Sequence, residues 1–251
     1  MKKWNYKGGL SIRWSTITWE LLLLAIFNFV LTSCDKEFIS GSGVIVTETR
    51  TVAAFTDINA EGPFHIHLRQ GTDGPVEITA DDNLMRVIDT YVSGNTLRIR
   101  IKKDVRLRAV GNIDIYLQSA KYYSVVFAGA GSVESLDTLR SPNFTYRTDG
   151  SGNARFRIVT DRLDTEINGS GDLQLLGSAT SFDSQISGSG NVSGLDLLCQ
   201  DVTVAVKGSG NHTLSVSHSL DVSIRGSGDV RYKGNPSITK DIQGSGRVIK
   251  L

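Results

Sequence analysis

The chain has 251 residues, with 27 Lys and Arg against 26 Asp and Glu. This near-neutral balance gives the chain no overall basic charge that would argue for a nucleic-acid-binding protein. The 26 glycines beside only 4 prolines exclude a disordered Pro/Gly tract, and with many Val, Ile and Thr residues they predict an all-β protein with tight turns.

The amino-terminal segment 1–33 has the features of a lipoprotein signal peptide. Basic residues such as Lys2 and Lys3 precede an apolar run over 21–31, which is too short for a membrane-spanning helix of roughly 20 residues. The run ends in Leu31-Thr32-Ser33-Cys34, which resembles a bacterial lipobox, where the cysteine is lipidated and becomes the first mature residue. An uncleaved anchor or a chance cysteine are the alternatives.

We therefore expect an exported chain that is held at the cell envelope by a lipid on Cys34, at the periplasmic or the surface face of the outer membrane. Residues 34–43 would form the lipid-anchored tether. Once Cys34 carries the lipid, no disulfide can form within the chain, because Cys199 is the only other cysteine. Cys199 lies in an apolar stretch and is expected as a small core residue rather than a reactive thiol.

A repeat begins in the middle of the chain. Gly-Ser-Gly recurs six times and a Gly-Ala-Gly variant precedes it, with the first glycines 18 to 21 residues apart. Intervals in this range predict a β-solenoid of stacked coils, with the motif at one corner of each coil. The first glycines are Gly129, Gly150, Gly169, Gly188, Gly208, Gly226 and Gly244.

Apolar residues occupy fixed positions around each corner. The residue six positions before the first glycine is apolar in all seven coils, from Tyr123 to Ile238, and the residue two positions before is apolar except for Thr148. This alternation is typical of a strand with one buried face. A second inward column follows four positions after the glycine and includes His212.

Each coil is thus expected to have a first side before the corner, a second side after it, and a looser third side. A sharp corner needs a positive φ, which Gly adopts freely and Asn or Asp tolerates. Stacked Asn side chains can also hydrogen-bond along such a ladder. The polar position that begins the second side is filled in five consecutive coils by Asn153, Asp172, Asn191, Asn211 and Asp229.

The pattern predicts one solenoid domain over 44–251. Gly94 and Gly111 lie at similar intervals upstream and are expected as further corners, and 44–104 is interpreted as an irregular amino-terminal cap. A separate small β domain is the alternative for this segment. Within it, Leu84, Val87, Ile88 and Tyr91 fall on one face of a predicted helix.

The sequence resembles the family of the putative auto-transporter adhesin, head GIN domain. The resemblance covers about residues 50–245 and is most specific in 55–59, 64–71 and 76–84, before the serial Gly-Ser-Gly corners. It implies a right-handed parallel β-helix at the bacterial cell envelope. It supplies no catalytic or binding residues that could be transferred to this chain.

Known site chemistries find little support in the sequence. Calcium-binding nonapeptide repeats need Gly and Asp every nine residues, whereas here the corner comes once per coil and is often Asn. Coils of 18–21 residues leave no room for the long loops that carry pectinase-type sites. His65 and His67 share a strand face without a third metal ligand nearby in sequence, so we expect no metal, no cofactor and no catalytic residues.

The expected function is therefore that of a non-catalytic envelope lipoprotein that presents a regular solenoid surface for adhesion. Its partner would be a polysaccharide, another envelope protein or a host surface. The alternative is a carbohydrate-active β-helix enzyme, which clustered carboxylates on one face would favour. A purely structural or signalling envelope component is a further alternative.

Overall fold

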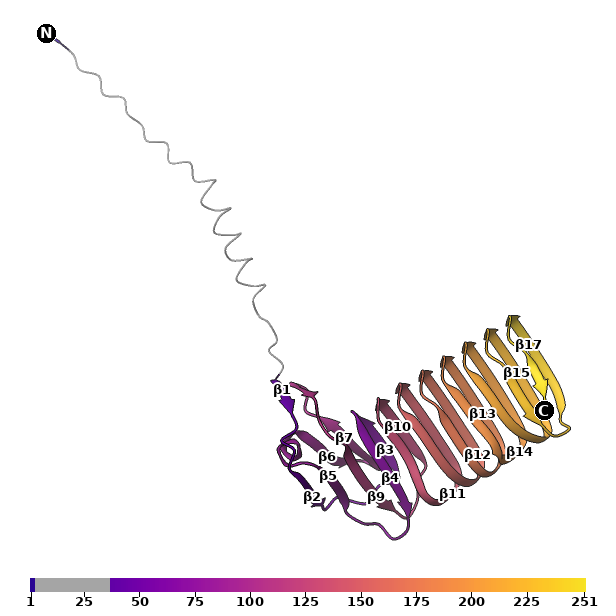
Figure 1. Ribbon diagram of the computed structural model, residues 1–251, viewed down its shortest axis with the longest axis horizontal. Helices are drawn as coiled ribbons and strands as arrows, with labels where there is room; N and C mark the ends of the chain where they lie inside the picture. Colours follow the sequence, from indigo (N-terminus) through magenta and orange to yellow (C-terminus); the bar gives the residue numbers. More distant parts are fainter. Residues whose placement is uncertain (3–36) are drawn as a thin grey trace. The chain divides into compact units, whose positions relative to one another are not determined.

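The computed structural model describes residues 1–2 and 37–251 (Figure 1). Most of the predicted signal peptide, together with Cys34, lies outside the described residues. No helix within the described residues has the length and apolar character needed to cross a membrane. The body, residues 38–251, forms one compact unit.

The body consists of strands and one short 3-10 helix. Sixteen strands join in a single sheet, and β1 pairs separately with β8. The cap elements are β1 (Glu37–Ser40), β2 (Ile45–Arg50), β3 (Asp57–Glu61), β4 (Phe64–Gln70), β5 (Val76–Asp81), η1 (Asp82–Val87), β6 (Ile88–Ser93), β7 (Thr96–Ile101), β8 (Val105–Arg108) and β9 (Ile113–Ser119). The solenoid elements are β10 (Ser124–Gly129), β11 (Ser132–Gly150), β12 (Asn153–Gly169), β13 (Leu173–Gly188), β14 (Asn191–Gly208), β15 (Asn211–Gly226), β16 (Val230–Lys233), β17 (Ser237–Gly244) and β18 (Val248–Lys250).

The long strands β11 to β15 each wrap around one coil and pair in parallel with the next. Corner meets corner in the register, so Gly150 pairs with Gly169, and Gly169 with Gly188. Figure 1 shows the coils stacked side by side from β10 to β17. The structure confirms the predicted all-β solenoid, whose stacking buries a face that no single coil could bury alone.

The inward columns form the core as the period-two pattern predicts, except at both ends. Phe144, Leu163 and Phe182 are fully buried in the first-side column. Tyr123 is only half-buried, because the neighbouring Tyr122 takes the interior place and donates its hydroxyl to the carbonyls of Arg69 and Leu117. Ile238 is 40% exposed, since no further coil covers the last one.

One polar group lies deep in this core. His212 has no exposed surface, and its Nε2 lies 2.8 Å from the hydroxyl of Ser184. The Thr165 hydroxyl donates to the same Ser184 oxygen over 2.9 Å, so the Ser184 proton is free to point at His212. With Nε2 in contact with Ser184, the Nδ1 atom of His212 has no hydrogen-bond partner among the described residues.

The amino-terminal cap differs from the sequence prediction in two respects. Gly94 lies in the hairpin between antiparallel strands β6 and β7, and Gly111 lies in the loop before β9, so neither is a coil corner. The corner stacked beneath Gly129 is Gly62, since β10 pairs with β3 and β11 with β4. The chain leaves the stack after β4, builds the cap and returns, which breaks the interval that the other corners keep.

The predicted helix in the cap is also wrong beyond its first turn. Residues Asp82–Val87 form a 3-10 helix, and Ile88–Ser93 continue as strand β6 against β7. The helical spacing of Leu84, Val87 and Ile88 arises because side chains of two successive elements enter the same core. Residues 37–43, expected as tether, pack on this cap: the amide of Gly43 donates to Asp81 and the side chain of Asn83 donates to the carbonyl of Ser40.

Candidate functional site

The corner glycines carry two separate constraints. The first glycine of each motif has a positive φ, for example 141° at Gly169 and 122° at Gly208. A Cβ on Gly169 would also overlap the carbonyl oxygen of Gly150 in the coil beneath. The last glycine of the motif, such as Gly171, lacks a positive φ but would collide with the corner below in the same way. The corners are therefore small because they stack as well as because they turn.

The Asn and Asp residues that begin the second sides form a continuous hydrogen-bonded ladder. The Oδ1 atom of Asn153 accepts from the amide of Asp172 over 2.9 Å, and Asp172 accepts from the Asn191 amide over 3.1 Å. The ladder continues through the next coils, where Asn191 accepts from the Asn211 amide and Asn211 accepts from the Asp229 amide. At the last step Asp229 accepts from Arg231 and Arg247, and the hydrogen bond from Arg247 is the main reason that the pKa of its carboxyl is lowered.

Every carboxylate or amide oxygen of Asn153 to Asp229 that faces the next coil thus has a protein partner. Calcium would need several of these oxygens directed at one point, whereas each one is directed at the next coil. The described residues contain no group of three or more His, Cys, Asp or Glu side chains suited to a metal ion. Contacts between successive coils thus involve the corner glycines Gly150, Gly169, Gly188, Gly208 and Gly226 and the ladder residues Asn153, Asp172, Asn191, Asn211 and Asp229.

His65 and His67, expected on an exposed strand face, are half-buried at the junction of cap and solenoid. His65 contacts the hydroxyl of Ser132 over 2.8 Å. His67 lies between two carboxylates, with Glu134 at 2.8 Å from Nδ1 and Asp114 at 3.1 Å from Nε2. The two carboxylates approach different ring nitrogens, so they do not converge with them on one metal position.

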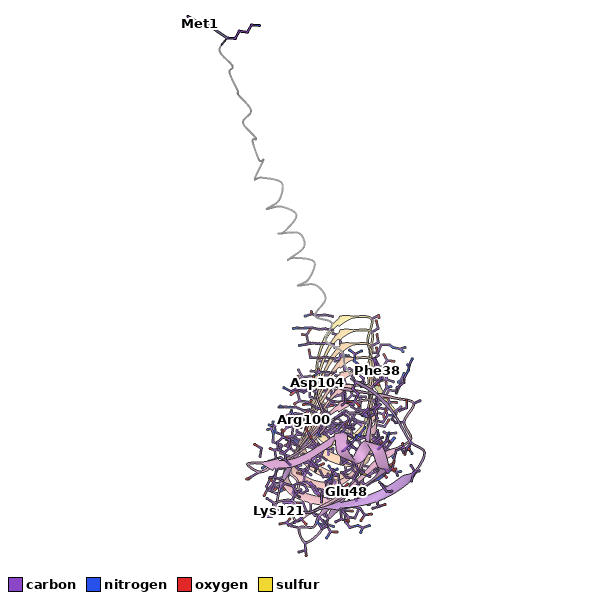
Figure 2. The ribbon with its side chains drawn as sticks, turned by 90° about the vertical axis from the view of Figure 1, so that its left-hand side faces the viewer. Met1, Phe38, Glu48, Arg100, Asp104 and Lys121 are labelled. Atoms are coloured by element: carbon purple, nitrogen blue, oxygen red, sulfur yellow. The ribbon has the colours of Figure 1, made fainter. Side chains whose placement is uncertain are left out.

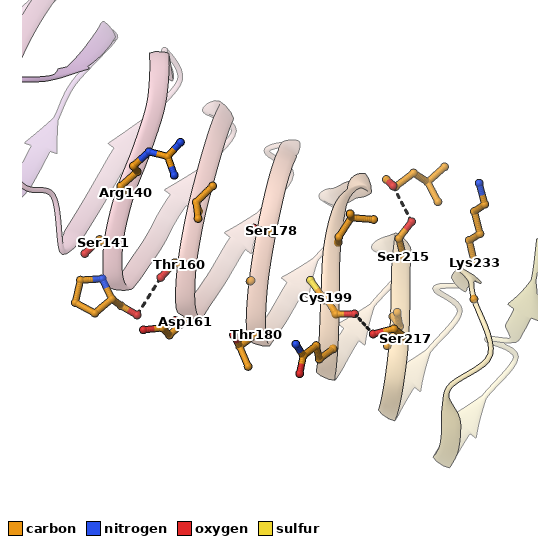
Figure 3. Close-up of a pocket in the computed structure, with 18 of the residues that line it drawn as sticks. Arg140, Ser141, Thr160, Asp161, Ser178, Thr180, Cys199, Ser215, Ser217 and Lys233 are labelled. Atoms are coloured by element: carbon orange, nitrogen blue, oxygen red, sulfur yellow. Dashed lines mark hydrogen bonds between the residues drawn. The ribbon is translucent and has the colours of Figure 1, made fainter.

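A groove of about 1160 Å³ lies along the third sides of the coils (Figure 3). It runs from Arg140 in the coil of Gly129 to Lys233 in the coil of Gly226. Five coil steps of about 4.8 Å give it a length of about 24 Å. The groove therefore has the dimensions of a site for an extended chain rather than for a compact ligand.

The floor of the groove is a column of small side chains. Register aligns Ser141 with Thr160, Thr160 with Ala179, and Ala179 with Cys199, and Val216 follows. The hydroxyls of Ser141 and Thr160 donate to backbone carbonyls, at 2.7 Å to Asn143 for Ser141. The floor consequently offers a ligand few free donors and behaves largely as an apolar surface.

One wall of the groove is raised by a β-bulge. The pairing of β14 with β15 slips between Gly194 and Leu198, and Leu195, one of the extra residues, is 42% exposed. Leu198 follows the bulge, pairs with Ser215 at an outward position, and is 68% exposed. The Ser215 hydroxyl donates to the carbonyl of Leu195 over 2.7 Å and fixes the bulge (Figure 3). Bulges often redirect side chains at functional sites, and large apolar side chains left in water beside a groove indicate a binding surface.

The lining of the groove differs from a glycosidase site with two carboxyl groups. Asp161 is the one carboxylate among its lining residues, whereas glycoside hydrolysis commonly uses two facing carboxyl groups. Burial raises the pKa of the Cys199 thiol to about 12, so the thiol stays protonated at neutral pH. Asp164 and Asp183, on the first sides, both bind Arg162, at 2.9 and 2.6 Å, as a surface ion-pair network.

Sequence reasoning placed Cys199 in the core and did not find the groove. The signal lies nine positions before the first corner glycine, where four successive coils carry Ser141, Thr160, Ala179 and Cys199. A column of small residues on one side of a solenoid leaves that side hollow. The bulge, by contrast, has no comparable signal beyond the extra length of the coil between Gly188 and Gly208.

Comparison with known proteins identifies the family. The family model described as "Putative auto-transporter adhesin, head GIN domain" matches residues 54–236. The chain belongs to this family. A search of curated protein sequences found no match to the chain.

Solved structures of the same shape come from Bacteroides and Parabacteroides species. A putative adhesin from Bacteroides fragilis shares 28% identity with a TM-score of 0.81, covering 85% of this chain and all of its own. A putative lipid binding protein from Parabacteroides distasonis shares 23% identity with a TM-score of 0.74, covering 86% of this chain and all of its own. A putative adhesin from Parabacteroides merdae shares 20% identity at a TM-score of 0.68, covering 86% of this chain and 99% of its own. The family and the Bacteroides fragilis neighbour support an adhesin-like, non-catalytic role in an extracellular or envelope protein.

Proposed function

We propose that this chain is a lipid-anchored protein of the cell envelope, held through Cys34, whose solenoid binds an extended partner in the third-side groove. The observation that carries the proposal is the apolar groove across six coils, bounded by the exposed Leu195 and Leu198. Exposing Leu195 and Leu198 to water is unfavourable by an amount that scales with their apolar area. A partner that covers them recovers this free energy.

The partner class follows from the lining of the groove. Apolar residues such as Val159, Ala179 and Val216 lie along its length, and charges occur at its ends and rim as Arg140, Lys233 and Asp161. An extended segment of an envelope or host protein, with apolar side chains for the floor, fits this distribution. A polysaccharide would leave the two leucines uncovered unless its sugar rings stacked on them.

A second candidate ligand is an acyl chain. The apolar floor suits one, and the Parabacteroides distasonis neighbour bears the name of a putative lipid binding protein. The basic residue at each end of the groove would then pair with an anionic headgroup. A carbohydrate-active enzyme is the least supported alternative, because the groove lining holds a single carboxylate.

The test uses the processed lipoprotein on arrays of envelope proteins, glycans and lipids. Leu198→Asp should weaken binding at least tenfold, since it places a charge against the apolar floor. Leu136→Asp is the matched control, because Leu136 is 45% exposed but does not line the groove. Equal binding by wild type and both variants would exclude the groove as the site, and turnover of a bound glycan would refute the non-catalytic function.

A further inference from the structure

Strand β8 and the turn before it form a basic surface on the cap. Residues 102–108 contain Lys102, Lys103, Arg106 and Arg108, with Asp104 as the one acidic residue among them. All five side chains are exposed. Within the described part of the chain, none of the four cations takes part in an ion pair. The cations stay hydrated and available to an external anion.

Exposed apolar side chains accompany this basic surface. Phe38 on β1 is 62% exposed, and the Arg108 guanidinium lies over its ring at 6.0 Å from the centroid. Elsewhere on the cap, Val44 and Ile45 are each 56% exposed, and the Val44 carbonyl accepts from the amide of Asp82. Figure 2 looks onto this end of the body, with Phe38 and Asp104 in the same part of the view. We refer to Phe38, Lys102, Lys103, Arg106 and Arg108 as the cap patch.

The cap patch stands apart from the rest of the mature chain in charge. Removal of the signal peptide takes away four basic residues and Glu20, and leaves 23 Lys and Arg against 25 Asp and Glu. The mature body is therefore slightly acidic, while 102–108 carries a net charge of +3, or +2 when Glu37 on the paired strand is included. Charge of this sign, concentrated at one end, is complementary to an anionic surface.

The position of the patch in the chain indicates which surface that is. Phe38 follows Cys34 by four residues, and four residues of extended chain reach at most about 14 Å. A lipid on Cys34 would hold Phe38 within this distance of the bilayer interface. The ordered contacts of residues 37–43 with the cap leave little free tether to move the patch away.

We propose that the cap patch docks on the bilayer, with its lysines and arginines on anionic lipid headgroups and Phe38 at the interface. The proposal rests on the lipid anchor at Cys34 and is independent of the groove. One acyl chain holds a protein only marginally, and a basic patch is a common second signal. Docking would also orient the solenoid, since the cap would face the membrane and the coil of Gly244 would be the membrane-distal end.

The positions of the tryptophans allow a single-tryptophan probe to be introduced. All three tryptophans, Trp4, Trp14 and Trp19, lie in the signal peptide, so Phe38→Trp gives a processed lipoprotein with a single tryptophan. The variant is placed in nanodiscs of neutral lipid or of lipid with an anionic fraction, each containing brominated acyl chains. Mass spectrometry of the amino terminus establishes separately whether Cys34 is lipidated, so failure of the anchor and failure of docking are distinguished.

Docking predicts that brominated lipid quenches the fluorescence of the Phe38→Trp variant at least twofold more strongly in the anionic nanodiscs. High salt should reduce this difference, because surface charges are screened. Adding Arg106→Glu and Arg108→Glu should abolish the increase. Arg155→Glu with Arg157→Glu makes the same charge change at exposed solenoid positions and should leave it intact. Quenching that is equal in both lipids, or unaffected by the cap substitutions, would overturn the proposal.

Discussion

The buried His212 should make the solenoid sensitive to mild acid. Burial lowers the pKa of its imidazole from the ordinary 6.5 to about 3. Between these values the unfolded chain binds a proton that the folded chain does not, so stability falls as the pH drops below 6.5. With about 1.36 kcal/mol per pKa unit, the free energy of unfolding should decrease by about 2 kcal/mol between pH 7 and pH 5.

The physical reason for this shift also provides the variant. A protonated His212 would carry two N–H donors in a site whose one partner, Ser184, lies at Nε2. The coils on either side have Val192 and Val230 at the same position. His212→Val should therefore fit the core, remove the unpartnered Nδ1 atom, and leave Ser184 bonded to Thr165.

The assay is urea unfolding followed by far-UV circular dichroism at pH 5, 6 and 7. The wild type should lose about 2 kcal/mol more than His212→Val between pH 7 and 5. His65, His67 and His218 are present in both proteins, so their contributions cancel in the difference. Parallel pH profiles for the two proteins would show that His212 is protonated in the fold without cost, and would refute the reasoning.

Three further predictions concern the coil stack. Gly169→Ala should destabilise the protein by about 2 kcal/mol or more in the same urea assay, because Gly169 has a φ of 141° and an added Cβ would overlap the Gly150 carbonyl. Ser170→Ala, the control, should change stability by less than about 0.5 kcal/mol. Asp229→Asn should weaken the hold on Arg247, seen as faster hydrogen exchange at the Arg247 amide, while exchange in β12 stays unchanged. Lys240 occupies the inward column that holds Val204 and Val222 in the preceding coils, and an inward charge on an edge strand blocks further pairing. Lys240→Val should therefore promote end-to-end association in analytical ultracentrifugation, and a variant that stays monomeric at high concentration would contradict this role.

The solenoid was predictable because each coil has the same requirements at its corner and in its core. Each corner must be glycine because of its φ and its stacking, so a glycine recurs in each coil. Burial likewise requires an apolar residue at the same position of each coil, as at Phe144, Leu163 and Phe182. The cap was less predictable, because Gly62 contacts Gly129 across a long intervening stretch of chain and no local interval records such a contact. Tyr122 replaced Tyr123 in the core for a similar reason, since its hydroxyl is satisfied by the carbonyls of β4 and β9.

The groove was predictable only in part. Its small-residue floor is a column in the sequence and could have been found by extending the alignment to the third sides. The bulge before Leu198 depends on a slip of register between two strands, and the hydrophobicity of Leu195 to Leu198 suggests burial although Leu195 and Leu198 are exposed. The length of the groove follows from the number of coils and not from any one of them.

The uninterrupted register between β12 and β13 makes the stack extensible at that point. A coil inserted between β12 and β13 would meet a corner glycine, the core columns and an Asn or Asp ladder partner on each face. Each insertion would lengthen the rod by about 4.8 Å at a cost of about twenty residues. Duplication or loss of single coils is therefore a simple evolutionary route by which such a protein can adjust how far it projects, and how long a partner it accommodates, without redesign of its core.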